Sequence, residues 1–118
     1  MSKLGVLIAT EEGFFIPGTL PNRDHNPGDL RHSPHSFHTA ADPNAIGQID
    51  TNKHGWADLN RQLDLFAQRK LDLEQMIYEF APPSENNSAA YLQYVCTGLG
   101  VPSTTSVADA LMIPWEHA

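Results

Sequence analysis

The sequence predicts a mainly α-helical domain of the α+β class with one small β-hairpin. Three observations support this prediction. Apolar residues recur at helical spacing near both ends, turn-forming residues crowd the segment between residues 14 and 50, and the chain has 118 residues. That length is typical of one domain, so we expect residues 1–118 to form a single domain.

The first helix is expected near the N-terminus, because Leu4, Leu7 and Ile8 lie at helical spacing. It should end at Gly13, since glycine readily adopts the left-handed conformation that closes many helices. Two glutamates, at positions 11 and 12, then fall in its last turn.

Turn signals interrupt the segment from Phe14 to Asp50 and exclude long helices there. The run Asn-Pro-Gly-Asp at 26–29 predicts a rigid turn similar to type II, in which Pro27 fixes φ and Gly28 supplies a positive φ. Short strands, enough for a small hairpin, are expected at residues 29–31, 36–40 and 45–49.

The second half of the chain is expected to hold four helices. The first, near Lys53–Arg69, has apolar residues three and four positions apart that form one stripe. Asp72 should cap the second, and the Pro-Pro pair at 82–83 should stop it. Asn86 or Asn87 can cap the third, and a Ser-x-x-Asp pattern at 106–109 indicates a short fourth helix.

Composition and charge exclude several classes of function. A formal net charge of -7 would repel a phosphate backbone, so we expect no nucleic-acid partner. No stretch approaches the ~20 apolar residues of a membrane helix, so we expect no membrane partner. The N-terminal apolar run is interrupted at Glu11, too early for a secretory signal, and we expect synthesis in the cytoplasm.

Histidines gather in the turn-rich segment, at positions 25, 32, 35 and 38. The spacing of His35 and His38 is compatible with metal ligation, but the segment has no cysteine and no His-Glu-x-x-His helix. We therefore expect no metal and no cofactor. We also expect these histidines to make binding or activity sensitive to pH between about 5 and 7.

A carboxyl group at the end of the first helix is the leading candidate for chemistry. The helix dipole disfavours negative charge at Glu11 and Glu12, and the apolar run Phe14-Phe15-Ile16 follows them. Both effects favour the protonated form of a carboxyl group. A protonated glutamate is what acid-catalysed glycosidic cleavage requires, because the leaving oxygen must receive a proton.

A larger pattern surrounds these glutamates. It consists of the segments EGF at 12–14, NPGDLR at 26–31, GQIDTNKHGWADL at 47–59 and YEFAPPSENNSAAY at 78–91. Together they resemble the lysozyme-like superfamily of peptidoglycan-cleaving proteins, in particular its small phage- and prophage-associated branch. The resemblance implies a lysozyme-like helical domain whose β-hairpin lines a cleft. It also implies cleavage between N-acetylmuramic acid and N-acetylglucosamine.

The resemblance further implies roles for single residues. Glu12, directly before Gly13, matches the helix-terminal general acid of the family, and Glu11 is the other choice. Gln48 lies on the hairpin where many relatives carry a glutamine that touches substrate. The remaining candidate substrate-binding residues are Asn26, Asp29, Asp50 and Tyr91.

The chemistry at this site has three alternatives. Most glycosidases use a second carboxylate, and Asp24, Asp29 or Asp50 could supply it, which would make the protein a hydrolase of the muramidase class. Without one, a single glutamate would act as acid and then base, as the resemblance to lytic transglycosylases allows. A non-catalytic phage structural or glycan-binding protein could keep the same fold. We expect hydrolysis.

The implied partners are the glycan strand and other phage virion or lysis proteins. The implied site of action is the bacterial cell wall or periplasm, or a virion.

Overall fold

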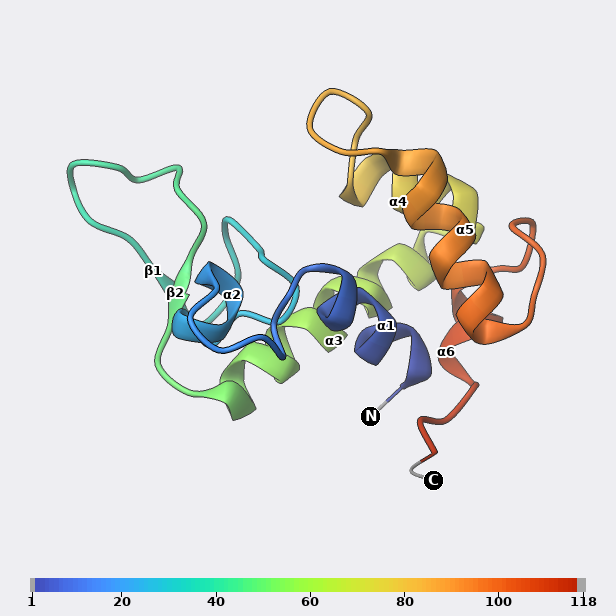
Figure 1. Ribbon diagram of the computed structural model, residues 1–118, viewed down its shortest axis with the longest axis horizontal. Helices are drawn as coiled ribbons and strands as arrows, with labels where there is room; N and C mark the ends of the chain where they lie inside the picture. Colours follow the sequence, from blue (N-terminus) through green and yellow to red (C-terminus); the bar gives the residue numbers. More distant parts are fainter. Residues whose placement is uncertain (1, 117–118) are drawn as a thin grey trace. The chain divides into compact units, whose positions relative to one another are not determined.

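The structure, a computed structural model, describes residues 2–116. Within this range it has six helices and one two-stranded antiparallel sheet, and about half of the chain is helical (Figure 1). The predicted class, mainly helical α+β with a small hairpin, is confirmed. None of the described helices combines the length and the apolar character needed to cross a bilayer.

The chain forms two compact units. One is Ile8–Gln62, and the other combines the residues up to Leu7 with those from Leu63 onward. Two helices, α1 (Lys3–Glu11) and α3 (Asn52–Gln68), contribute residues to both units. The single domain expected from length stays a prediction.

The unit Ile8–Gln62 is built around a short hairpin. Besides parts of α1 and α3 it contains α2 (Leu20–Arg23), β1 (Ser36–Phe37) and β2 (Gln48–Ile49). The strands pair antiparallel, with Ser36 opposite Ile49 and Phe37 opposite Gln48. Its buried apolar side chains include Phe14, Leu30, Ile49 and Leu59. The hairpin is much shorter than the sequence predicts, and residues 29–31 form no strand.

The other unit contains α4 (Leu73–Phe80), α5 (Ser88–Leu99) and α6 (Val107–Leu111), with α4 and α5 in contact (Figure 1). The predicted caps are confirmed. Asp72 and Gln75 form a capping box at α4, Asn87 caps α5, and Ser106 caps α6. Gly100 closes α5 with a left-handed φ of 72°. The caps of these helices act within a few residues, so the sequence alone predicts where the helices begin.

Helix α1 ends at the residues that the sequence indicates. Gly13 has a φ of 81°, and its N–H donates to the carbonyl of Thr10 at 3.1 Å. The N–H of Phe14 donates to the carbonyl of Ala9 at 3.0 Å. This pair of hydrogen bonds is a Schellman cap, which satisfies carbonyls at the helix end and fixes the direction in which the chain leaves.

One short helix is absent from the sequence prediction. Helix α2 has Thr19 as its N-cap, whose side chain accepts a hydrogen bond from the N–H of Asn22, and a proline in its first turn. Both features favour a helix start. The Pro-Asn pair at 21–22 also resembles a turn, and a four-residue helix is too short to show an apolar period.

The expectation that Gly28 supplies a positive φ is wrong. The turn is closed by the N–H of Asp29, which donates to the carbonyl of Asn26 at 3.0 Å, but the left-handed residue is Asp29, with a φ of 52°. A type II turn needs a positive φ at its third residue, so this turn is not type II. Glycine at position 28 leaves room for a neighbouring side chain, because a Cβ there would lie 2.8 Å from Cδ1 of Leu59, which would have to shift.

Gly55 provides a test of this packing. A Cβ at Gly55 would lie 1.9 Å from the backbone carbonyl oxygen of His25. Alanine normally stabilises a helix by about 1 kcal/mol relative to glycine. Here we expect Gly55→Ala to lower the free energy of unfolding by about 3 kcal/mol, because backbone must move. Urea unfolding followed by circular dichroism measures the change.

The exposed Asn60 on the same helix supplies the control, and Asn60→Ala should change stability by less than about 0.5 kcal/mol. A Gly55→Ala protein as stable as the parent would contradict the close approach of α3 to residue 25.

Candidate functional site

Most of the predicted site residues belong to one unit. Those within Ile8–Gln62 are Glu12, Asn26, Asp29, Gln48 and Asp50. Tyr91 belongs to the other unit, where it is a core residue of α5 that is 3% exposed. The acid and the hairpin residues can therefore be described together.

Glu12 lies half-buried immediately after α1, while its neighbour Glu11 is exposed. The N–H of Glu12 continues the helical pattern by donating to the carbonyl of Ile8 at 2.9 Å. The loop that follows is bound to α2, because the hydroxyl of Thr19 donates to the carbonyl of Gly13 at 2.8 Å. The backbone on both sides of Glu12 is therefore fixed.

Aromatic side chains follow Glu12 directly. Phe14 is buried and meets Trp56 edge to face, with ring centroids 5.5 Å apart. Phe15 lies 6.1 Å from Trp56, and 54% of it remains exposed. Two further apolar side chains of this segment, Ile16 and Leu20, are also more than half exposed. Exposed apolar side chains that lie together often mark a binding surface, and these follow Glu12 closely in the sequence.

The side chain of Asn26 is entirely buried. Its Nδ2 donates to the carbonyls of Leu30 and Gly47, at 2.8 and 2.9 Å, and its Oδ1 accepts from the N–H of Leu30 at 3.0 Å. Both amide donors are thus used within the protein. Asn26 joins the 26–29 turn to the residue before β2, and its predicted contact with substrate stays a prediction.

Gln48 is exposed on β2, opposite the exposed Phe37 of β1. The backbone around it is held to the preceding turn. The N–H of Gly47 donates to the carbonyl of Leu30 at 2.9 Å, and the N–H of Ile49 donates to the carbonyl of Asp24 at 2.8 Å. Gln48 is therefore a solvent-accessible amide on a fixed strand, as a substrate-contacting residue must be.

The candidate second carboxylates have different environments. Burial, reinforced by the nearby charge of Asp24, raises the pKa of Asp29, and Arg31 opposes this only in part. Within the described residues, Oδ1 of Asp29 is buried without a hydrogen-bond partner. A hydrogen bond from His54 lowers the pKa of the exposed Asp50. The pKa values of the two carboxyl groups are thus shifted in opposite directions, upward at Asp29 and downward at Asp50.

A further carboxylate escaped the sequence analysis. Asp58 of α3 is 2% exposed, and its carboxylate accepts hydrogen bonds from the hydroxyl of Ser33 at 2.6 Å and from Nδ1 of His35 at 2.6 Å. The main-chain N–H of His35 donates a third, at 2.9 Å. Burial raises the pKa of Asp58, but these hydrogen bonds outweigh it and the net shift is downward. No local signal could reveal the cluster, because Asp58 lies 25 positions after Ser33 and 23 positions after His35.

Within residues 2–116, no group of three or more histidine, cysteine or acidic side chains is arranged to hold a metal ion. The expectation that the protein needs no metal stays a prediction.

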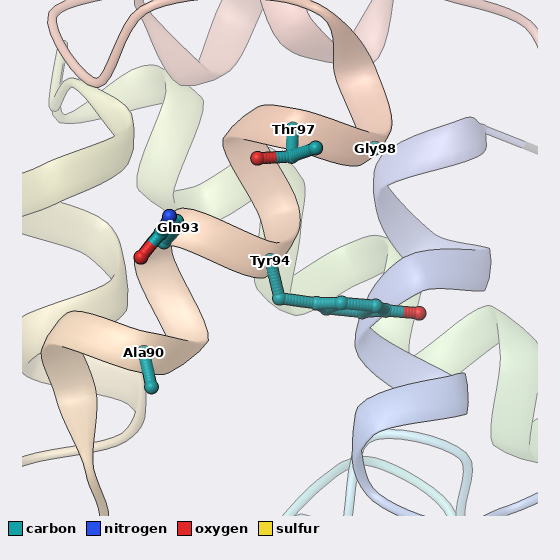
Figure 2. Close-up of a pocket in the computed structure, with 5 residues that line it drawn as sticks. All are labelled: Ala90, Gln93, Tyr94, Thr97 and Gly98. Atoms are coloured by element: carbon teal, nitrogen blue, oxygen red, sulfur yellow. The ribbon is translucent and has the colours of Figure 1, made fainter.

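A shallow groove of about 440 Å³ lies along α5. It is lined by Ala90, Gln93, Tyr94, Thr97 and Gly98, and Figure 2 shows Tyr94 extending from the helix beside them. None of these residues is a predicted site residue, and none carries a carboxyl or imidazole group. The groove therefore offers no acid–base chemistry of its own.

Comparison of the chain with known proteins finds no matching family model, no matching curated protein and no matching solved structure. The sequence resemblance and the geometry around Glu12 are therefore the two grounds for proposing a function.

The amide of Asn26 can be tested through stability. Asn26→Ala leaves the N–H and carbonyl of Leu30 and the carbonyl of Gly47 buried without this partner. We expect the free energy of unfolding to fall by about 3 kcal/mol, since each buried polar group left without a partner costs about 1–3 kcal/mol. Denaturant unfolding measures it, with Asn44→Ala at an exposed position as the control. A loss below about 1 kcal/mol would contradict the structural role.

The buried carboxylate of Asp58 should make the stability of the protein depend on pH. Its folded-state pKa lies below the unfolded value, so its stabilising effect is present above about pH 4 and is lost as the pH falls through the folded pKa. Asp58→Asn should lower the free energy of unfolding by about 2 kcal/mol at pH 7. Between pH 4 and pH 2 the variant should lose less further stability than the parent protein. Thermal unfolding across this range measures both effects. Parallel pH curves for the two proteins would contradict the assignment.

Proposed function

We propose that this protein cleaves the glycan strand of peptidoglycan between N-acetylmuramic acid and N-acetylglucosamine, with Glu12 as general acid on a lysozyme-like fold. The position of Glu12 carries the proposal. It is half-buried at a Schellman-capped helix end, and an exposed aromatic surface follows it within three residues. Under this proposal the protein acts at the bacterial cell wall, in the periplasm or within a phage virion, together with other phage lysis or virion proteins.

In the proposed reaction the carboxyl group of Glu12 donates its proton to the glycosidic oxygen as the bond to the anomeric carbon breaks. The mechanism requires this carboxyl group to be protonated before the reaction. The exposed face of Phe15, supported by Trp56, offers a surface on which a sugar ring can stack. Gln48 can donate and accept hydrogen bonds with sugar hydroxyl and acetamido groups.

Hydrolysis needs an ionised group that activates water or attacks the anomeric carbon. Among the candidates, Asp50 meets this requirement best, because the hydrogen bond from His54 keeps its pKa low. Asp29 meets it least, since burial and the charge of Asp24 raise its pKa. We therefore assign the second carboxylate to Asp50 in the muramidase mechanism.

One observation favours the lytic transglycosylase mechanism as a second candidate. Oδ1 of Asp50 is already hydrogen-bonded to Nδ1 of His54 at 2.7 Å and to the N–H of Thr51 at 2.9 Å. If these bonds keep the Asp50 carboxylate from acting as a base, Glu12 must itself act as the base after it has donated its proton. Glu12 would then take up a proton from the 6-hydroxyl group of the muramyl residue. The oxygen of that group attacks the anomeric carbon and forms the 1,6-anhydro ring.

Glu12→Gln tests the proposal, because glutamine keeps the shape of the side chain and cannot donate the proton. We expect the clearing rate of permeabilised bacterial cells to fall at least about 100-fold, with an unchanged circular dichroism spectrum. The adjacent, exposed Glu11 provides the matched control, and Glu11→Gln should keep most of the activity.

Mass spectrometry of the released muropeptides separates the mechanisms, since only the transglycosylase forms the anhydro product. Equal clearing by the parent protein and Glu12→Gln would remove Glu12 from the mechanism. Absence of clearing by the parent, with retained binding to cell walls, would indicate a glycan-binding protein instead.

A further inference from the structure

The hairpin has one face toward the protein and one toward solvent. Ser36 is half-buried and its partner Ile49 is only 2% exposed, whereas Phe37 and its partner Gln48 are both exposed. Residues directly opposite each other in an antiparallel pair share a face, with Cβ atoms about 5 Å apart. The aromatic ring of Phe37 and the amide of Gln48 are therefore neighbours on the solvent face.

The side chain of Phe37 is available to a ligand. It is 52% exposed, so the protein covers less than half of its surface. None of the ring contacts within residues 2–116 involves Phe37. The solvent face of an antiparallel sheet normally carries polar side chains, so packing within the protein does not account for an aromatic residue at this position.

Bonds from outside the sheet hold both strands in place. In the loop that leads into β1, the hydroxyl of Ser33 and the N–H of His35 donate to the carboxylate of Asp58, at 2.6 and 2.9 Å. Before β2, the amide of Asn26 donates to the carbonyl of Gly47 at 2.9 Å. Two residue pairs do not form a stable hairpin alone, so these bonds fix the solvent face. A fixed surface loses little conformational entropy when a ligand binds.

The charge around this face favours an uncharged ligand. Strands β1 and β2 contain no charged residue. The residue directly after β2 is the exposed Asp50, and the whole chain has a formal net charge of -7. Both the local and the overall charge oppose the binding of an anionic polymer.

The size of the face fits one sugar ring better than a protein partner. A stable protein–protein interface buries about 800 Å² on each partner, whereas an aromatic side chain contributes about 150–250 Å² even when it is buried completely. A pyranose ring presents an apolar face of C–H groups that stacks on an aromatic ring. Its polar substituents need donors and acceptors, and a glutamine amide supplies both.

We propose that Phe37 and Gln48 form a subsite for one N-acetylated sugar residue of the glycan strand. The ring stacks on the pyranose, and the amide of Gln48 donates to the acetamido carbonyl and accepts from the acetamido N–H. This inference rests on the proposed function, because the glycan strand of peptidoglycan supplies the N-acetylated sugars. It adds Phe37 to the substrate-contacting residues and makes the acetamido group the feature that is recognised.

Binding of chitotetraose, the tetramer of N-acetylglucosamine, tests the subsite. The full-length Glu12→Gln protein serves as the background, so that binding is measured without cleavage. NMR titration gives the Kd and the backbone amides that respond, which should include those of residues 36–37 and 47–49. Cellotetraose has the same linkage and lacks the acetamido groups, and we expect its Kd to be at least about tenfold higher.

Variants in the same background assign the contacts. Phe37→Ala should raise the Kd for chitotetraose at least about tenfold, whereas Phe37→Trp keeps a stacking ring and should stay within about threefold. Gln48→Ala should reduce the preference for chitotetraose over cellotetraose to less than about threefold. Tyr78→Leu is the matched control, because it removes an exposed aromatic ring from the other unit, and it should bind like the background protein.

Unchanged affinity in Phe37→Ala would overturn the subsite, as would equal binding of the two tetramers by the background protein or no binding of either. Phe37→Leu, which also removes the ring, replaces the alanine variant if alanine disturbs folding. The clearing assay of the parent protein separates the two proposals. Clearing by the parent together with normal binding in Phe37→Ala rejects the subsite alone. Lack of clearing together with chitotetraose binding that depends on Phe37 rejects the cleavage alone.

Discussion

The buried amide of Asn26 is the interaction on which the predicted site depends. Its three hydrogen bonds join the 26–29 turn to the backbone before β2, and no water can replace them at a fully buried position. The same turn packs so closely on α3 that only glycine fits at position 55. The place of Gln48 on β2 therefore depends on one side chain that itself has no free donor.

Glu12 is held by a second, independent set of contacts. A Schellman cap fixes the end of α1, and Thr19 and Asn22 of α2 bind the loop that follows, Asn22 through a bond from Nδ2 to the carbonyl of Phe14 at 3.0 Å. These bonds use backbone groups, so the side chains of Phe15 and Ile16 are left exposed. A loop that is fixed by its backbone and presents apolar side chains is suited to binding, because little conformational entropy is lost when a ligand arrives.

The parts of the structure that the sequence predicts well are those with local causes. Helix caps at Asp72, Asn87 and Ser106 act within three residues, and the cap at Gly13 needs only the absence of a Cβ. The errors at Gly28 and at the 29–31 strand have a different origin. There the backbone conformation follows from packing on Leu59 and from hydrogen bonds to residue 47, which no local pattern contains.

The residues of the candidate site also differ in whether the sequence alone could reveal them. Glu12 and Gln48 could be named because a resemblance and a helix end mark them, whereas the role of Asp58 could not, since an aspartate on an amphipathic helix normally indicates a solvated face. The contrast between Asn26 and Asp58 shows the limit of reasoning from residue type. Both are polar, both are buried, and only the long-range partners reveal that Asn26 joins the turn to the residue before β2 and that Asp58 holds the loop containing His35.

Asp50 connects the proposed chemistry to His54, which donates a hydrogen bond to its carboxylate. Protonation of His54 converts its bond to Asp50 from a neutral donor–acceptor contact into an ion pair, which holds the carboxylate more tightly and makes it a weaker base. A hydrolase that relies on Asp50 would therefore lose its water-activating group as His54 is protonated. A transglycosylase that relies on Glu12 alone would not lose it, because Glu12 supplies both the acid and the base. The bond between His54 and Asp50 therefore affects hydrolysis and not the formation of the anhydro product, so the two mechanisms differ in how they depend on this contact.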